Sequence, residues 1–494
     1  MSGSGGTPSR ASDGADDRRS FALPPDFPIA LDRGTSLWSG GRVATGGSPW
    51  KLVRFGAAAQ PYLAALRRAG PRGLADSSSI GRALARRLLD HGLANPVPAA
   101  RPGSHDVTVV IPAFGRADEL DGTLAAIKGL PAIVVDDGSP DPEPLRRTAA
   151  AHGARLIRHP RNRGPAAARN TGLRLVETPF VAFVDSDCRP VDGWLDALIP
   201  HFDDPRVEAV APRIVPRPGE SRLLARYEAA RSALDMGTRP ALVRPGAKLG
   251  FVPTATLVVR TSAMRDLTFD EDMRLGEDVD FVWRLADRGG HVRYRPEAQV
   301  THTPRLDPRA WARRRHEYGT SATALARRHP GRLAPARPSA WNLAGLAFLA
   351  YGRPLPALAC TTVAGGLLAR ALNGTPGRWT LSGAIVGKGT VADAAAIGHA
   401  LRREWWPLGL ACLAASGRNR LARAAAAAML APIALEWITE RPALDPFRYT
   451  AVRLAEDVAY GSGVTASAWR HGSFQALLPD VRFPLPKGRN KGGR

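Results

Sequence analysis

The chain has 494 residues, 44% of them hydrophobic, which is enough for two or three domains that each bury a core. Its formal net charge of +23 favours a partner with negative charge, such as an anionic membrane surface or a phosphorylated small molecule. Only 6% of the residues are aromatic, which disfavours a stacking surface for nucleic acid, so no nucleic-acid partner is expected. The three widely spaced cysteines (Cys188, Cys360 and Cys412) predict neither a disulfide framework nor a cysteine zinc site, and they indicate a reducing compartment.

The N-terminal region predicts a tail followed by a small α+β module. Residues 1–20 are polar and Gly/Ser-rich, lack the apolar core of a signal peptide, and are expected to be disordered. Residues 21–100 show short strand patterns broken by Gly-Gly turns and then two helical patterns. This order suits a winged-helix-like or peptide-docking module, and it equally suits a packing subdomain that only covers the next domain. The composition of residues 98–106 predicts a linker.

From residue 107 the pattern changes to apolar strands that alternate with amphipathic helices. Such alternation predicts a parallel sheet covered on both faces, in which ligands bind at the carboxyl ends of the strands. Three of these ends carry "PAFGR", "DDGS" and "DSD". The predicted strands cover residues 107–114, 132–139, 154–160 and 180–187.

The "DSD" end places two carboxylates, Asp185 and Asp187, at alternate positions of an extended segment. Side chains so spaced point to the same side and repel each other, so a positive group is expected between them. With no His or Cys beside them, a hard cation such as Mg²⁺ or Mn²⁺ suits the pair, and such ions also take up ligand phosphates. The pair therefore predicts a nucleotide diphosphate, and the acidic end at Asp136–Asp137 strengthens that prediction.

Five motifs carry a family resemblance: "VTVVIPAFGR", "IVVDDGS", "NRGPAAARNTG", "VAFVDSD" and "LGEDVDFVWRL". In this order and spacing, over residues 105–305, they resemble the family 2 glycosyltransferases with the GT-A fold. The resemblance implies an α/β domain at 105–330, a Rossmann-like nucleotide-diphospho-sugar transferase with a mostly parallel sheet. It also implies a UDP-sugar donor, a hexose as the transferred group, and Mg²⁺ or Mn²⁺ as cofactor.

The resemblance assigns a role to each matching residue. Asp137 would contact the nucleotide base, Asp136 would shape the same pocket, and Asp278 would be the general base that deprotonates the acceptor hydroxyl. A single base without a second paired carboxylate implies direct attack and inversion. The nucleotide-sugar set is Pro112, Phe114, Asp136, Asp137, Arg169 and Asp185; the metal set is Asp187, Asp185 and His302; the acceptor-side set is Glu277, Trp283 and Arg284.

Simpler interpretations stay open for several of these residues. Asp278 lies where a helix is expected to begin, so it could only cap that helix. Trp283 could stack on a sugar face or pack in the core, and His302 could be a buried, hydrogen-bonded histidine. Arg284 stands in "FVWR", where processive members carry a Gln/Arg-Arg-Trp signature, so processivity by that device is not expected.

The region at 331–480 is Ala-rich and apolar, and arginines flank its apolar segments. A spanning helix needs about twenty apolar residues, and these segments are short or weakly hydrophobic. We expect a helical region associated with an anionic cell membrane, with the catalytic domain in the cytoplasm; a soluble helical bundle is the alternative. The segments cover residues 341–351, 355–372, 405–415 and 422–438, and a basic tail follows at 481–494.

The whole layout also resembles one subgroup, the glycosyltransferases of the mycofactocin system. That subgroup attaches β-1,4-linked glucose units to a redox cofactor made from a short ribosomal peptide. The resemblance implies a peptide-derived small-molecule acceptor, which the N-terminal module would dock. A polyprenyl-phosphate or cell-wall lipid acceptor is the alternative, and a non-catalytic membrane-surface scaffold is a further one.

Overall fold

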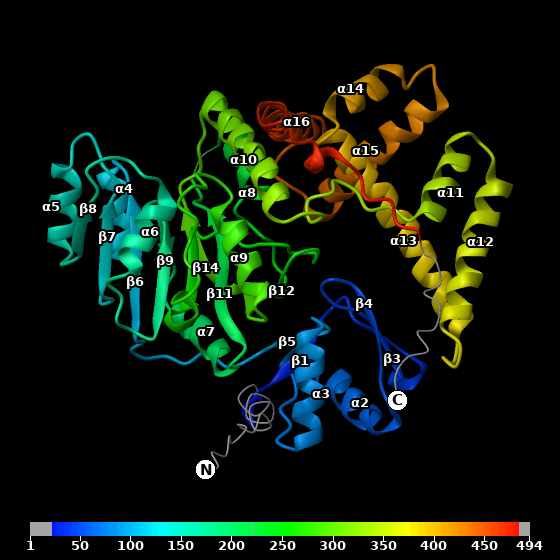
Figure 1. Cartoon of the computed structure of the whole chain (residues 1–494), viewed down its shortest axis with the longest axis horizontal. Helices are drawn as coiled ribbons and strands as arrows, with labels where there is room; N and C mark the ends of the chain where they lie inside the picture. The colour runs from blue at the N-terminus through cyan, green and yellow to red at the C-terminus, as the bar shows by residue number, and fades with distance from the viewer. Residues whose placement is uncertain (1–21, 220, 484–494) are drawn as a thin grey trace, which may run out of the picture. The chain divides into compact units, whose positions relative to one another are not determined.

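The computed structural model describes residues 22–219 and 221–483 (Figure 1). The expected disordered tail at 1–20 and most of the expected basic tail at 481–494 lie outside the described residues. The chain divides into two compact units, which we call the sheet unit and the helical unit. The sheet unit comprises Met1–Ile214, Met236–Glu271 and Asp278–His302, and the helical unit comprises Val215–Asp235, Asp272–Glu277 and Thr303–Arg494.

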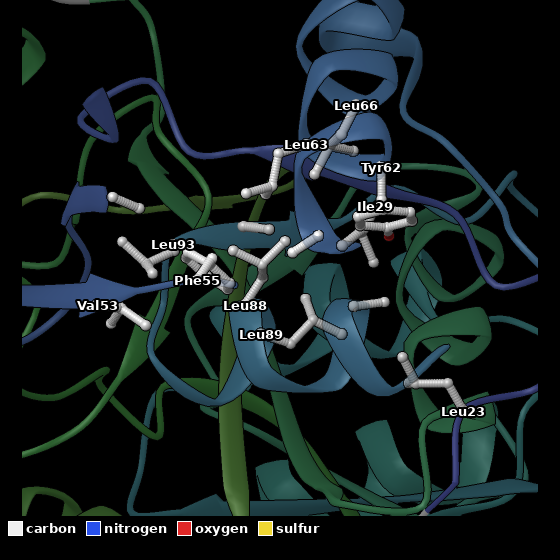
Figure 2. Close-up of a cluster of buried hydrophobic side chains, with 14 of the residues drawn as sticks. Leu23, Ile29, Val53, Phe55, Tyr62, Leu63, Leu66, Leu88, Leu89 and Leu93 are labelled. Atoms are coloured by element: carbon white, nitrogen blue, oxygen red, sulfur yellow. The ribbon is translucent and has the colours of Figure 1, made fainter. Parts of the chain in front are cut away.

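The sheet unit begins with the small α+β module. Strands β2, β3 and β4 form an antiparallel three-stranded sheet, β1 pairs with β5, and helices α2 and α3 supply apolar faces. The hydroxyl of Ser78 caps α3 by accepting a hydrogen bond from the Gly81 N–H at 3.0 Å. Figure 2 shows the resulting core, to which Leu63 contributes from α2 and Leu88 from α3. The bounds are β1 Ile29–Leu31, β2 Ser36–Trp38, β3 Val43–Gly46, β4 Lys51–Arg54, α2 Gln60–Ala69, α3 Ser79–Asp90 and β5 Ala94–Pro96.

A nine-stranded mixed sheet follows, in the order β10-β14-β11-β13-β9-β6-β7-β8, with β12 pairing to β14. The first four strands, β6 to β9, pair in parallel and agree with the predicted apolar runs. The later strands extend the sheet with antiparallel pairs, for example β13 on β9. The α/β class expected from the sequence is therefore confirmed. The bounds are β6 Val107–Ala113, β7 Ala132–Asp136, β8 Arg155–Arg158, β9 Phe180–Val184, β10 Cys188–Pro190, β11 Val207–Pro216, β12 Ala241–Val243, β13 Thr256–Arg260 and β14 His291–His302.

Helices cover this sheet and fix where its loops lie. Helix α6 packs closely on β6, because a Cβ at Gly172 would come within 2.4 Å of the Val110 side chain. Any larger residue at that position would push α6 away from the sheet. The bounds are α4 Ala117–Ala126, α5 Glu143–Ala151, α6 Pro165–Leu173, α7 Trp194–Leu198 and α9 Glu277–Asp287.

The helical unit consists of α8 and the helices from α10 onward (Figure 1). Four of its helices match the predicted apolar segments, whereas α13 and α16 were not predicted. Both carry charged residues and glycines that dilute the apolar pattern. The bounds are α8 Leu223–Ala230, α10 Pro308–Arg328, α11 Ala340–Ala350, α12 Pro354–Ala371, α13 Arg378–Arg402, α14 Trp406–Ala415, α15 Arg420–Glu440 and α16 Pro446–His471.

The interior of the helical unit holds a network of buried ion pairs. Arg315 of α10 donates to Glu228 of α8 at 2.5 Å and to Glu456 of α16 at 2.9 Å. The Tyr227 hydroxyl donates to the same Glu456 at 2.6 Å. The network therefore joins three helices through four residues that are each at most 9% exposed.

One helix among the described residues, α15 at Arg420–Glu440, is long and apolar enough to cross a membrane by length and composition. The most apolar 18-residue stretch of α15 has a mean hydropathy of 1.5, and 22% of that stretch is buried. Many other apolar side chains on the helices of this unit are also exposed, among them Leu355 at 78% and Leu358 at 62%.

Candidate functional site

Three strand ends of the sheet unit lie side by side, as the sequence predicts. Strand β6 lies between β7 and β9, and the register places Ala113 opposite Asp136 and Val110 opposite Phe183. The residues that follow these positions therefore share one edge of the sheet. Pro112 and Phe114 belong to the end of β6; Pro112 is half-buried and Phe114 is 50% exposed, so its ring is available at this edge.

The two carboxylates of "DSD" each have an arginine partner. The Arg169 guanidinium, buried on α6, donates to Asp185 at 2.8 Å. The Arg116 guanidinium lies 3.7 Å from the Asp187 carboxylate and is largely exposed. Arginines thus supply the positive charge expected near the pair. Asp185 and Asp187 each keep about a quarter to a third of the side chain exposed, so both remain accessible to a ligand.

The two aspartates of the "DDGS" end differ in how far their carboxylates are hydrogen-bonded. Asp137 is fully engaged, because its carboxylate accepts hydrogen bonds from the His159 ring at 2.8 Å, the Arg163 N–H at 2.9 Å and the Gly164 N–H at 2.7 Å. One oxygen of Asp136 accepts from the Ser139 N–H at 2.9 Å. Its other oxygen, Oδ2, is buried and has no hydrogen-bond partner among the described residues, although the Arg158 guanidinium lies 3.3 Å away.

Gly138 between these residues is required by the backbone. It has a φ of +76°, and a Cβ there would lie 2.5 Å from the Arg161 carbonyl carbon. The turn after β7 can therefore close on the loop before α6 only with glycine at this position. The loop in turn delivers the N–H groups that Asp137 binds.

Sequence reasoning missed three residues at this edge: Arg116, Arg158 and His159. Arg116 ends the first motif and has a φ of +54°, which is uncommon outside glycine. His159 is buried and bridges Asp137 to the Thr171 hydroxyl of α6 at 2.9 Å. The "RHP" at the end of β8 gave no signal by itself, because the contact of His159 with Asp137 is formed only once β7 and β8 pair.

Helix α9 is connected to the same edge through the segment before β13. The Asp185 N–H donates to the Ala255 carbonyl at 2.8 Å, and the Trp283 indole N–H donates to the Gly250 carbonyl at 2.8 Å. Trp283 is only 5% exposed, which favours packing over sugar stacking. Arg284 donates to Asp280 at 2.6 Å and to the Thr268 carbonyl at 2.7 Å.

The first turn of α9 carries the expected acid groups. Asp278 is half-buried, and its carboxylate accepts from the Val279 N–H at 2.8 Å, so it does contribute to the helix N-terminus. Glu277 is 7% exposed and belongs to the helical unit by its packing. Of this pair, Asp278 is the more accessible.

His302 ends β14 and stands opposite Cys188 in the antiparallel pair with β10, one register position from Asp187. Among residues 22–219 and 221–483, no three His, Cys, Asp or Glu side chains are gathered closely enough to hold a metal ion. Burial and the charges of Asp185 and Asp187 raise the pKa of the Cys188 thiol well above its usual value. The thiolate is therefore disfavoured, which argues against Cys188 as a nucleophile.

The sheet, with its parallel strands β6 to β9 and its acidic strand ends, has the GT-A architecture that the motifs predict. The family model described as "Glycosyl transferase family 2" matches residues 108–267, which span the strands from β6 to β13. A relative of nearly the same length extends this match to 93% of the chain, so the chain belongs to the family 2 glycosyltransferases and is an enzyme.

That relative is the pre-mycofactocin glycosyltransferase of Mycobacterium tuberculosis, 39% identical over 472 residues, which are 93% of this chain and 99% of the relative. Glycosyltransferase AglE of Haloferax volcanii is 25% identical over 211 residues, covering 40% of this chain and 67% of AglE. Among solved structures, the mannosyltransferase PcManGT of Pyrobaculum calidifontis, in complex with GDP-Man and Mn²⁺, has a TM-score of 0.37 and 23% identity, and the match covers 63% of this chain and 92% of that one.

Proposed function

We propose that the enzyme transfers a hexose, glucose in the first instance, from a UDP-sugar to the peptide-derived precursor of a redox cofactor, with inversion and β-1,4 linkage in the product. The proposal for the acceptor rests on one observation, the 39% identity across 93% of the chain to a pre-mycofactocin glycosyltransferase. The site supports the donor, because paired carboxylates at a parallel strand end suit a nucleotide diphosphate and its cation.

Asp185, Asp187 and His302 are the side chains proposed to hold Mg²⁺ or Mn²⁺. The carboxylates fit such an ion, since Mg²⁺ commonly binds through one or two carboxylates and takes its other ligands from phosphates and water. The two arginines beside them fit a diphosphate, which arginine binds in a fork geometry. When bound, the ion would neutralise the negative charge that develops on the leaving diphosphate.

For the nucleotide base we propose Asp136 as the contact, rather than Asp137. Both oxygens of Asp137 are already used to hold the loop before α6. Asp136 instead keeps one oxygen without a hydrogen bond, which would suit the N–H of a uracil ring; because this oxygen is buried 3.3 Å from the Arg158 guanidinium, that arginine would have to move aside. Asp137 would then act as the residue that orients the loop 159–164.

Asp278 is the proposed general base. Its carboxylate would take the proton of the acceptor hydroxyl while that oxygen forms a bond to the anomeric carbon and the bond to the diphosphate breaks. The Trp283–Gly250 and Asp185–Ala255 hydrogen bonds support this role, because they fasten α9 to the segment that borders the donor site. Attack from the face opposite the diphosphate inverts the anomeric carbon.

The acceptor would be presented by the N-terminal module, for which a groove offers room. The groove lies between α2 and the start of α3, and its lining includes Tyr62, Leu74, Asp76 and the exposed Ile80. A lipid-linked acceptor is the second candidate. It is favoured by the exposed apolar side chains of the helical unit, which also support attachment to an anionic membrane surface.

The experiment is release of UDP from a panel of UDP-sugars with Mg²⁺ or Mn²⁺, with and without the peptide-derived precursor. We expect release from one sugar that rises with the precursor, together with a glycosylated product of inverted configuration. Asp278→Asn should lose transfer but keep UDP binding, while Asp287→Asn at the exposed end of the same helix should behave as wild type. Transfer to a polyprenyl phosphate alone would establish the second candidate instead, and absence of any transfer would support a scaffold.

A further inference from the structure

The first half of β14 carries basic side chains into the interior of the sheet unit. His291 and Arg293 stand at alternate positions and share a face of the strand. Arg293 is only 2% exposed, which is unusual for a side chain that is always charged. On this face they meet the carboxyl end of α3, because the Arg293 guanidinium donates to the Leu89 carbonyl at 3.4 Å.

More positive charge converges on the same point. Asp90, the last residue of α3, has the guanidinium of Arg206 at 2.9 Å, that of Arg86 at 3.3 Å and the ring of His291 at 3.5 Å. Arg244 donates to the Asp90 main-chain carbonyl at 2.7 Å. The carboxyl end of a helix attracts cations in general, but the oxygens at the end of α3 are too few to accept hydrogen bonds from all of these guanidinium groups.

A second carboxylate, Asp204, does not balance the charge. It is fully buried and accepts from Arg86 at 2.5 Å and from the Arg206 N–H at 3.0 Å. The cluster therefore contains four arginines (Arg86, Arg206, Arg244 and Arg293) against two aspartates. The Arg293 guanidinium, which is 2% exposed, has no carboxylate partner of its own in this cluster among the described residues, and an unbalanced buried charge is costly.

Several buried nitrogen atoms of the cluster lack a hydrogen-bond partner, and most of them are donors. Nε and Nη1 of Arg293, Nε of Arg86 and Nδ1 of His291 are buried without a hydrogen-bond partner among the described residues. Both ring nitrogens of His201, which is 2% exposed, are also without one. The arginine nitrogens can only donate, and each neutral imidazole has one N–H, so the missing partner is an acceptor.

The titration of these groups agrees with an excess of positive charge. Burial, followed by the charges of Arg295 and Arg293, lowers the pKa of His201 from 6.5 to about 3. Burial likewise lowers the pKa of the Arg293 guanidinium from 12.5 to about 10. Burial and four arginines lower the pKa of His291 well below its usual value.

We propose that this cluster, between the end of α3 and the strand β14, binds a small inorganic anion of the size of chloride or phosphate. The anion would accept hydrogen bonds from Arg293 and its neighbours and compensate the surplus charge. A water molecule could satisfy some donors but would leave the charge unbalanced. Because the ligands come from both the module and the mixed sheet, the anion would fasten the module to the catalytic domain.

The test is thermal unfolding of the full-length wild-type protein in sodium gluconate, chloride, bromide and phosphate at one ionic strength. We expect a saturable rise in melting temperature with one or more of the three small anions over gluconate. Arg293→Met should remove that rise, and the control Arg288→Met, at an exposed arginine in the turn before β14, should keep it.

Crystals of the wild-type protein soaked in bromide give a readout that does not depend on the folding of a variant. We expect an anomalous peak within hydrogen-bond distance of Arg293 Nε or Nη1. Equal melting temperatures in all four salts, together with density for water alone or for no atom at that position, would overturn the proposal.

Discussion

The sheet unit and the helical unit place charge in opposite ways. In the sheet unit, the apolar strand β9 is buried from Val181 to Val184, and carboxylates such as Asp185 lie at the strand ends, where they are partly exposed. In the helical unit, charged groups such as Arg315 and Glu456 are buried in the interior, while leucines of α12 are exposed. Charged groups at the strand ends can reach a ligand, whereas the buried charged groups of the helical unit join helices to one another.

The largest effect should come from a charge at the strand ends. Asp187→Ala should lower metal-dependent turnover by about a thousandfold, because losing a ligand to the ion removes several kcal/mol of transition-state stabilisation. The melting temperature should stay near that of the wild type, since the side chain is partly exposed and its arginine partner is solvated. Turnover assays with UDP-sugar and Mn²⁺ measure the first, and thermal unfolding measures the second.

Asp192→Ala is the matched control, because Asp192 is an exposed aspartate shortly after the pair. It should keep wild-type turnover. Near-full activity of Asp187→Ala would show that the "DSD" end does not bind the cation.

The second prediction concerns the buried ion pairs of the helical unit. Arg315→Met removes the common partner of two buried carboxylates and should destabilise that unit by about 3–5 kcal/mol. Denaturant unfolding measures the loss. Arg314→Met changes the neighbouring arginine, whose partner Glu317 is exposed, and should cost less than about 1 kcal/mol. Equal effects of the two substitutions would contradict the importance assigned to the buried network.

The third prediction concerns acid and the sheet unit. His201 has a folded pKa of about 3 against 6.5 in the unfolded chain, so below pH 6.5 the unfolded state binds a proton that the folded state does not. Stability should therefore fall as the pH decreases from 6.5, by at most about 1.4 kcal/mol per pH unit for this group. His201→Gln should flatten the dependence between pH 6.5 and 5, as measured by denaturant unfolding.

His152→Gln changes an exposed histidine and should leave that slope unchanged. An unchanged slope in His201→Gln would mean that other groups cause the acid sensitivity.

The smallest expected effect concerns the exposed leucines. Leu355→Ser with Leu358→Ser should weaken binding to anionic vesicles by about tenfold, since each leucine contributes about 0.7 kcal/mol when part of its exposed surface enters an apolar phase. Vesicle co-sedimentation measures it. Trp50→Ser, an exposed apolar position of the sheet unit, should leave binding unchanged. Equal binding by all three proteins would favour a soluble helical bundle.

The parts that the sequence predicts well share one property: their signal is local. The strands β6 to β9 are short apolar runs, and the acidic ends are adjacent residues, so both could be recognised without knowing the fold. Contacts between distant segments could not be predicted this way. His159 reaches Asp137 only through the pairing of β7 with β8, and α13 is a mixed Ala, Gly and polar helix whose partners come from other helices.

The membership of α8 in the helical unit has a consequence for synthesis. The Tyr227–Glu456 hydrogen bond joins residues 229 positions apart, so α8 leaves the ribosome long before its partner exists. The module and β6 to β9 can fold during that interval, but Tyr227 and Glu228 must wait for α10 and α16. This wait exposes α8 to chaperones and proteases in every nascent chain. The yield of active enzyme should therefore depend on how fast the last third of the message is translated.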